Sequence, residues 1–208
     1  MLALRATAMI MPAFHEWPAE AAIIARLLGG YGELEFELAL CMGYSIRDMR
    51  KGIRDFFAAR GEKARIDLAK TEATLAMRLT GIADEFGRAL QAIRHCKDIR
   101  NSLSHCHWAS LKHSQPSDGL FYVNLEQSAT ASSGPIVYEW RQATLAWLQD
   151  CEAYYRYTTD CLWHVQGRIA AQRGQPMPLS IIMPKRRKPP AKFVEAPADS
   201  RAVLPKDF

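Results

Sequence analysis

The apolar and polar residues of the chain alternate with the period of amphipathic helices. From Pro18 to about Gly43, apolar side chains recur every three or four positions, and proline in the first turn is typical of a helix start. The Gly29–Gly30 pair interrupts this segment and predicts either a bend or a close packing contact. The pattern therefore predicts one long helix after residue 17.

A second, shorter helix is expected to follow. Ser45 and Asp48 resemble a capping box, in which side chains satisfy the free amides of a helix start. The apolar face then continues to Arg60, and Gly61 is expected to end the helix. The opposite face of this helix carries a basic stripe, made of Arg47, Arg50, Lys51 and Arg54.

The helical period continues over most of the remaining chain. Residues 62–104 are almost continuously helical in pattern, and a break near Thr80–Gly81 divides them into two helices. A last long helix is predicted from Thr144 to about Arg173, with Gly174 closing it.

Two segments depart from this pattern. The runs LFYVNL and PIVYEW are rich in β-formers and flank a small polar run, which predicts a β-hairpin at about residues 119–140. Residues 175–208 are rich in proline and lysine and poor in aromatic residues, which predicts a disordered tail. The expected fold is all-α: an up-and-down bundle of four to five helices with an inserted hairpin. Residues 1–16 would be an N-terminal extension and residues 17–174 the helical domain.

The charge of the chain is unevenly distributed. The net charge is +5, but residues 1–174 hold 20 Lys and Arg against 19 Asp and Glu, whereas residues 175–208 hold seven against three. The helical part is therefore nearly neutral, and charge alone does not predict nucleic-acid binding by it. The basic tail could attract RNA or remain a solvated extension.

The cysteines and the N-terminus bear on location. The five cysteines are an odd number and most lie within helical patterns, which predicts free thiols in a reducing cytoplasm. Arg5 interrupts the apolar N-terminal run and no cleavage site follows, so a signal peptide is not expected. No run is long enough to span a membrane.

The chemistry of the sequence is concentrated in HCKDIRNSLSHCHWAS, residues 95–110. Asn101 and His105 are four residues apart and share one helix face, whereas Arg100 lies roughly 140° from His105 on an ideal helix. The residues between them are poor helix formers, so we expect the helix to end there and His105 to curl back toward Arg100. Arginine matches the oxygens of a phosphate, and histidine transfers protons near neutral pH. This combination favours phosphodiester chemistry.

Other interpretations of these side chains stay open. His95, Cys96, His105, Cys106, His107 and His113 are zinc-type ligands, but no second matching pair has zinc-site spacing, so no metal is expected. Alternatively, Arg100 could pair with an acidic residue of the first helix, namely Glu33, Glu35 or Glu37, in a purely structural cluster.

The motif RNSLSH resembles the Arg-Asn-x-x-x-His signature of the HEPN superfamily (higher eukaryotes and prokaryotes nucleotide-binding). YGELEFEL in the first helix resembles a Gly-x-Leu-Glu pattern common in bacterial members, and the layout is similar over residues 18–173. A small glycine often follows the histidine of the family, whereas Cys106 and His107 follow here and could alter access to the site.

The resemblance implies a metal-independent endoribonuclease without a cofactor, in which two motifs meet across a homodimer. Arg100 would stabilise the phosphate, His105 would act as general acid or base, and Asn101 would orient the site. His107 and the stripe residues Arg47, Arg50 and Lys51 are candidate RNA-binding residues, and Glu35 a candidate orienting carboxylate. Many bacterial members are toxins or antiphage effectors neutralised by a nucleotidyltransferase-type antitoxin. The alternative is a non-catalytic helical dimer that binds a protein or a nucleotide.

Overall fold

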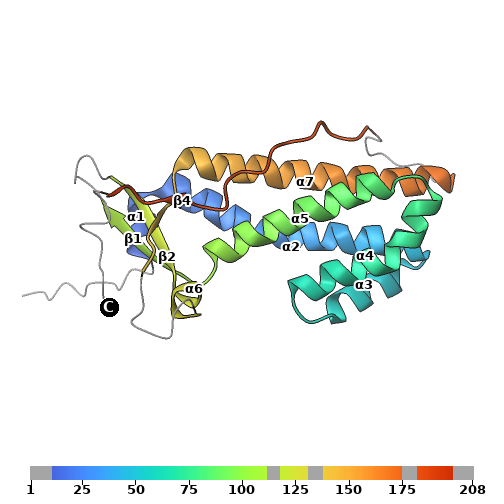
Figure 1. The fold of residues 1–208 in the computed structure, drawn as a ribbon, viewed down its shortest axis with the longest axis horizontal. Helices are drawn as coiled ribbons and strands as arrows, with labels where there is room; N and C mark the ends of the chain where they lie inside the picture. The colour runs from blue at the N-terminus through green and yellow to red at the C-terminus, as the bar shows by residue number, and fades with distance from the viewer. Residues whose placement is uncertain (1–10, 112–117, 131–137, 175–181, 199–208) are drawn as a thin grey trace, which may run out of the picture.

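The computed structural model describes residues 11–111, 118–130, 138–174 and 182–198. These residues are mostly helical, with one small antiparallel sheet. Figure 1 shows the long helices lying side by side, with the sheet at one end of them. In chain order the elements are α1 (Pro12–Glu16), α2 (Pro18–Ile46), α3 (Met49–Ala58), α4 (Glu62–Leu79), α5 (Ala83–Leu103), β1 (Cys106–Leu111), β2 (Gly119–Asn124), α6 (Leu125–Thr130), β3 (Arg141–Gln142), α7 (Leu145–Gln172) and β4 (Val194–Glu195).

α2 is the central helix, and it contacts α3, α4, α5 and α7. It begins at Pro18, as predicted, and continues through Gly29 and Gly30 without a break. A side chain at Gly29 would meet nothing within 4 Å, and one at Gly30 would only touch Tyr155. The glycine pair therefore marks neither a helix break nor a tight contact. Tertiary burial stabilises the helix through a continuous apolar stripe that includes Ile23, Ile24, Leu27, Leu34 and Leu38.

α3 begins later than the capping box predicted. Its N-cap is Asp48, whose carboxylate accepts a hydrogen bond from the Lys51 amide at 2.9 Å. Ser45 still belongs to α2, where its hydroxyl donates to the carbonyl of Cys41 at 2.7 Å. Because that hydroxyl is engaged within α2, it does not cap the next helix.

The boundaries of α4 and α5 are partly as predicted. The break at Thr80–Gly81 is confirmed, and Gly81 has φ 69, a left-handed conformation that glycine adopts without strain. Gly61 was expected to end the preceding helix, but that helix ends at Ala58. Gly61 instead precedes α4 as its N-cap residue, with φ 85.

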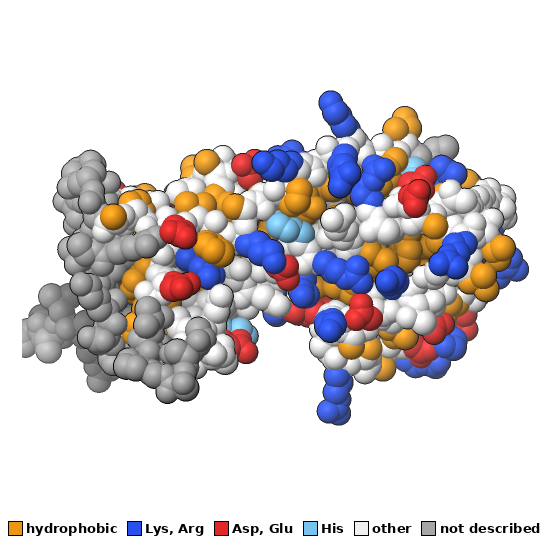
Figure 2. Space-filling view, in the orientation of Figure 1, with side chains coloured by type: hydrophobic (Ala, Val, Ile, Leu, Met, Phe, Trp, Pro, Cys, Tyr) orange, Lys and Arg blue, Asp and Glu red, His pale blue; other side chains and the backbone are white. Residues whose placement is uncertain are grey.

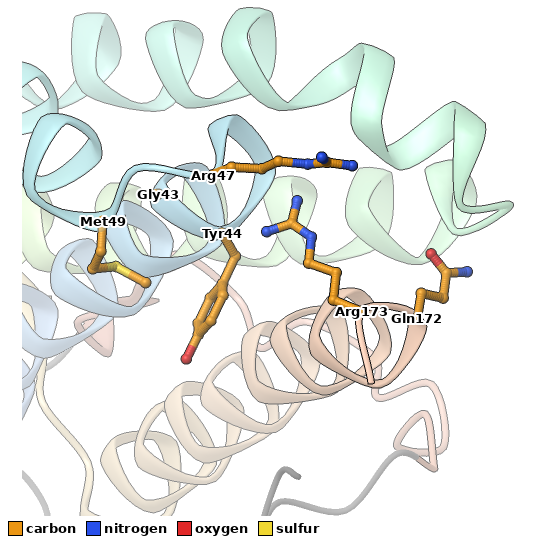
Figure 3. Close-up of a pocket in the computed structure, with 6 residues that line it drawn as sticks. All are labelled: Gly43, Tyr44, Arg47, Met49, Gln172 and Arg173. Atoms are coloured by element: carbon orange, nitrogen blue, oxygen red, sulfur yellow. The ribbon is translucent and has the colours of Figure 1, made fainter. Parts of the chain in front are cut away.

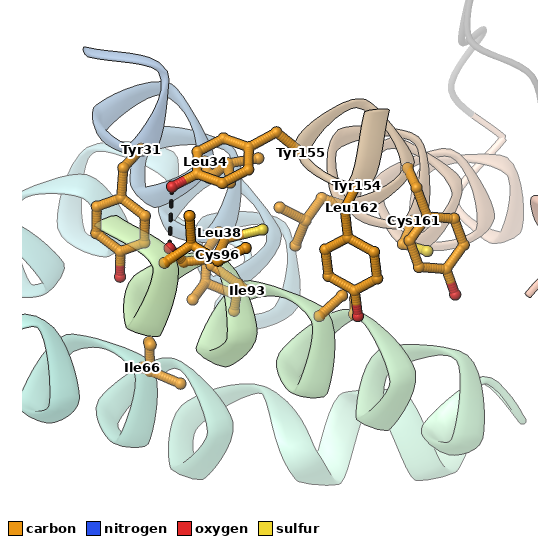
Figure 4. Close-up of a cluster of buried hydrophobic side chains, with 14 of the residues drawn as sticks. Tyr31, Leu34, Leu38, Ile66, Ile93, Cys96, Tyr154, Tyr155, Cys161 and Leu162 are labelled. Atoms are coloured by element: carbon orange, nitrogen blue, oxygen red, sulfur yellow. Dashed lines mark hydrogen bonds between the residues drawn. The ribbon is translucent and has the colours of Figure 1, made fainter. Parts of the chain in front are cut away.

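α7 matches its prediction closely. The Thr144 hydroxyl caps it by accepting from the Trp147 amide at 3.2 Å, and Gly174, with φ 67, follows its end. Figure 4 shows how α7 is joined to α5 through the core, because the Tyr155 hydroxyl donates to the Cys96 carbonyl at 2.9 Å. This buried hydrogen bond fixes the part of α5 that leads into the RNSLSH motif.

The antiparallel pairing predicted for residues 119–140 is confirmed in part, because β2 pairs with β3, which directly follows the second β-prone run. β2 covers the first β-prone run, and on its other edge it pairs with β1, which was not predicted, with Trp108 opposite Tyr122. The second run forms no strand at 138–140, and β3 follows it. The sheet order is β1-β2-β3-β4, and every residue of β2 is buried. The backbone amides and carbonyls of a buried strand need hydrogen-bond partners on both edges, and local β-propensity does not show which strands supply them.

Residues 182–198 do not form the predicted disordered tail. This segment, which we call the C-terminal strap, runs back along the helices to the sheet, where β4 pairs with β3 (Figure 1). The Trp147 indole donates to the Ala191 carbonyl at 2.8 Å, and His95 Nε2 lies 3.0 Å from the Pro190 carbonyl oxygen. Two of its backbone carbonyls thus contact side chains distant in the sequence, and such contacts cannot be predicted from composition. The rest of the expected tail, residues 175–181 and 199–208, lies outside the described residues.

The surface carries charges of both signs. In Figure 2, basic side chains extend from the middle of the molecule toward the end where α7 finishes, with acidic side chains among them. Four cysteines are buried, namely Cys41, Cys96, Cys151 and Cys161. Of the helices in the described ranges, none has both the length and the apolar character needed to cross a membrane.

Candidate functional site

Arg100 and Asn101 lie in the last turn of α5 and meet Glu62 from the first turn of α4. Arg100 Nη1 is 2.7 Å from Glu62 Oε1 and donates to Asn101 Oδ1 at 3.0 Å. Asn101 Nδ2 donates in turn to Glu62 Oε2 at 3.2 Å. The three side chains thus form a closed ring of hydrogen bonds. The ring is accessible, because Asn101 is exposed and the Arg100 side chain is 35% exposed.

The carboxylate beside Arg100 is therefore not one of those considered on the first helix. Glu35, the candidate orienting carboxylate, is buried and accepts two hydrogen bonds from Arg65 Nη1, at 2.9 and 3.1 Å. Glu37 accepts from Gln166 Nε2 at 2.7 Å. Glu62 was missed because its contact with Arg100 depends on how α4 and α5 pack, and no local motif reports that.

Tyr31 lies beneath these charged groups. Its hydroxyl is buried and has no hydrogen-bond partner among the described residues. Burial raises the pKa of Tyr31, and the negative charges of Glu35 and Glu62 raise it further. Figure 4 shows Tyr31 at the edge of the apolar cluster that includes Cys96 and Ile93 of α5. The end of α5 therefore rests on a packed core, which gives the exposed ring a rigid base.

His105 lies just beyond the end of α5, as predicted. The helix ends at Leu103, and His105 has φ 57, a left-handed conformation that is uncommon for a residue with a side chain. Its side chain is exposed and forms no hydrogen bond or ion pair with any residue in the described ranges. The imidazole is therefore available to solvent, while its backbone carbonyl accepts from the Leu125 amide at 3.3 Å.

Asn124 is a positioning residue that the sequence did not single out. It ends β2, and its Nδ2 donates to the carbonyls of Asn101 and Ser104 at 3.0 and 3.3 Å. Its Oδ1 accepts from the Gln127 amide at 2.9 Å. One side chain thus satisfies the free carbonyls at the end of α5 and the free amide at the start of α6. It fixes the turn from which His105 projects.

The two residues after His105 differ in their exposure to solvent. Cys106 is partly buried, its thiol donates to the Ser102 carbonyl at 3.0 Å, and burial raises its pKa to about 12. The thiolate needed for nucleophilic chemistry is therefore disfavoured near neutral pH. His107 is exposed on β1, with its ring 6.2 Å from that of Trp140. It remains a candidate contact for a ligand at this surface.

The basic stripe does not join the Arg100 site. Arg47 lines a hollow with Glu72 and Leu79, in the C-terminal half of α4, whereas Glu62 begins that helix. A helix rises about 1.5 Å per residue, so at least roughly 15 Å of α4 separates the two places. Lys51 is exposed and pairs with Asp55. Arg47, Lys51 and the exposed Arg50 therefore belong to a surface separate from the Arg100 site, and any contact they make with RNA would be made there.

No three His, Cys, Asp or Glu side chains of the described ranges come together as a metal site. The chemistry available at the end of α5 is thus a guanidinium, an amide, a carboxylate and an exposed imidazole. Comparisons with protein-family models, curated proteins and solved structures found no match to this chain.

Proposed function

We propose that the chain is a HEPN-like, metal-independent endoribonuclease with its site at the end of α5. The observation that carries the proposal is the exposed imidazole of His105, which has no partner among the described residues and follows the end of the helix that carries the accessible guanidinium of Arg100. An imidazole used only to stabilise the fold would be expected to have a partner. A proton-transfer group must instead be reachable by substrate.

The proposed reaction is a transesterification within RNA. A histidine takes the proton of the ribose 2′-hydroxyl, and the 2′-oxygen attacks the adjacent phosphorus. The bond to the 5′-oxygen breaks, and a second acid returns a proton to that oxygen. The products are a 2′,3′-cyclic phosphate and a 5′-hydroxyl. Arg100 would exchange Glu62 for the phosphate and stabilise its developing charge, and Asn101 would orient the guanidinium.

We propose that each chain is an up-and-down helical bundle and that two chains form a homodimer. One chain supplies a single motif histidine, and two copies facing each other would provide a separate base and acid. We further propose a cytoplasmic role as a toxin or antiphage effector, held inactive by a nucleotidyltransferase-type antitoxin. The substrate would be RNA.

The closed ring of Arg100, Asn101 and Glu62 favours a second candidate function. Each of these side chains already has a partner, as expected in a structural ion-pair cluster. The chain would then be a non-catalytic helical dimer that binds a protein or a nucleotide.

An RNA cleavage assay in the presence of a chelator separates the two candidates. The variants are Arg100→Ala, His105→Ala and, as a matched control, Arg94→Ala. Arg94 pairs with Asp67 at 3.1 Å and also joins α5 to α4, so its loss has a similar structural effect. The ribonuclease predicts cyclic phosphate ends that disappear in the first two variants and persist in the control. Intact RNA with the wild-type protein favours the binding module.

A further inference from the structure

Two arginines converge at the end of the molecule where α2 and α7 finish. Arg47 follows the last residue of α2, and Arg173 follows the last residue of α7. Both line an open hollow with a volume of about 560 Å³. Figure 3 shows the Arg173 side chain extending toward that of Arg47, while the Tyr44 ring of the same hollow points away.

The positive charge of this pair is not compensated within the described part of the chain. No carboxylate there forms an ion pair with Arg47 or Arg173. Glu72 lines the adjoining hollow, but it forms no ion pair with either guanidinium. Burial lowers the pKa of Arg173, and the positive charge of Arg47 lowers it further. Two like charges that line one hollow repel each other, and an anion bound between them would remove this repulsion.

Helix capping accounts for only one of the two arginines. Arg173 Nη2 lies 3.4 Å from the carbonyl oxygen of Ser45, where the partial negative charge at the end of α2 favours a cation. The Arg47 guanidinium donates no hydrogen bond to any described residue. Arg47 also has φ 63, at a helix-end position where glycine is usual. Non-glycine residues in such strained conformations cluster at functional sites.

We propose that Arg47 and Arg173 bind a phosphate group with two negative charges, as found in phosphomonoesters and pyrophosphate. Two planar guanidinium groups can each donate paired hydrogen bonds to phosphate oxygens. Arg47 lines a hollow with residues of the C-terminal half of α4, whereas the Arg100 ring lies at the start of that helix. The site is therefore separate from the proposed ribonuclease centre and does not depend on it.

Calorimetric titration of the full chain tests the proposal, with inorganic pyrophosphate and glycerol 2-phosphate as probes and sodium chloride holding ionic strength constant. We expect saturable binding, weakened about tenfold or more in Arg47→Gly and in Arg173→Gln, because each removes charge-assisted hydrogen bonds. Arg47→Gly suits the left-handed backbone, so it gives an answer even if Arg173→Gln fails to fold. Binding of both probes indicates a general phosphate site, and binding of one identifies its class.

The matched control is Arg54→Gln, which removes the same charge from an exposed position on α3. Its affinity for both probes should equal that of the wild type. If neither probe binds saturably, the proposal is overturned. An equal loss of affinity in Arg54→Gln would also overturn it, because the binding would then report net charge alone.

Discussion

Glu62 Oε1 lies 2.7 Å from Arg100 Nη1, so the arginine proposed to bind RNA already forms an ion pair within the protein. Glu62→Gln should therefore strengthen RNA binding about two- to fivefold, because the phosphate no longer competes with a carboxylate worth roughly 0.2–1 kcal/mol. Fluorescence anisotropy with a labelled RNA measures this. Asp67→Asn is the control, since it removes the same charge from the Arg94 pair between the same helices. Weaker RNA binding by Glu62→Gln would contradict a phosphate-binding role for Arg100.

Because His105 has a left-handed backbone conformation, substitutions there should affect stability and activity differently. Glycine adopts φ 57 freely, whereas alanine there is strained by about 1 kcal/mol. We expect His105→Gly to be more stable than His105→Ala by about that amount in urea denaturation. Both variants should lose RNA cleavage by about 100-fold or more, because neither transfers protons. A His105→Gly protein that still cuts RNA would rule out the proposed proton transfer.

Gly43 and Gly52 set the distance between α2 and α3. A Cβ at Gly52 would lie 2.4 Å from the Cα of Gly43, which is backbone and has no room to move away. Gly52→Ala should therefore lower the free energy of unfolding by about 2–3 kcal/mol. Gly87→Ala is the matched control, because a Cβ at that helical position meets nothing within 4 Å. It should stabilise the protein by up to about 1 kcal/mol. Equal effects would contradict the close contact.

His95 should make stability depend on pH. Burial lowers its pKa from 6.5, the bond to the Pro190 carbonyl and the charge of Asp98 partly offset this, and the charge of Lys192 lowers the pKa further. Below about pH 6.5, His95 is protonated more readily in the unfolded chain than in the folded protein. The free energy of unfolding should therefore fall on acidification, until the pH is below the pKa of His95 in the folded protein.

Denaturation midpoints from pH 7.5 to pH 5 test the role of His95. His95→Gln keeps a donor for Pro190 but cannot titrate, so its pH dependence should be flatter than that of the wild type. Lys192→Gln should lie between the two, because one cause of the lowered pKa is removed. Identical slopes in the wild type and His95→Gln would show that His95 does not contribute.

The C-terminal strap should contribute to the stability of the whole fold. It buries Ala196 at 2% exposure, and Lys192 lies 2.7 Å from Asp98 on α5. A chain ending at residue 181 would also leave the Trp147 indole without its carbonyl acceptor. We expect a loss of roughly 2 kcal/mol or more, since one unsatisfied buried donor costs about 1–3 kcal/mol. A chain ending at residue 198 is the control and should resemble the wild type; equal losses would contradict this role.

The long helices could be predicted because their evidence is local. In α2, α5 and α7 the apolar period spans many turns, and residues typical of helix ends, such as Pro18, Gly81 and Thr144, lie at the observed boundaries. The start of α3 was less predictable, because Ser45 and Asp48 are both good caps and only the conformation of α2 decides between them.

Features that depend on distant partners could not be predicted. β-propensity identified the residues of β2 but not β1 on its other edge, and composition could not show that the carbonyls of Pro190 and Ala191 accept side-chain hydrogen bonds. The same limit applies to the candidate site. The end of α5 just before His105 follows from local residue types, whereas the Glu62 contact and the support from Asn124 arise only when separate elements pack together.

The position of β4 in the sheet constrains how the protein forms during translation. β3 pairs with β2 on one edge and with β4 on the other, but β4 is synthesised after the whole of α7. While the ribosome is still producing that helix, one edge of β3 has no strand to pair with, and exposed strand edges favour association with other chains. The helices can pack before the sheet is complete, so closure of the strap is expected to be a late step that ends this vulnerable period.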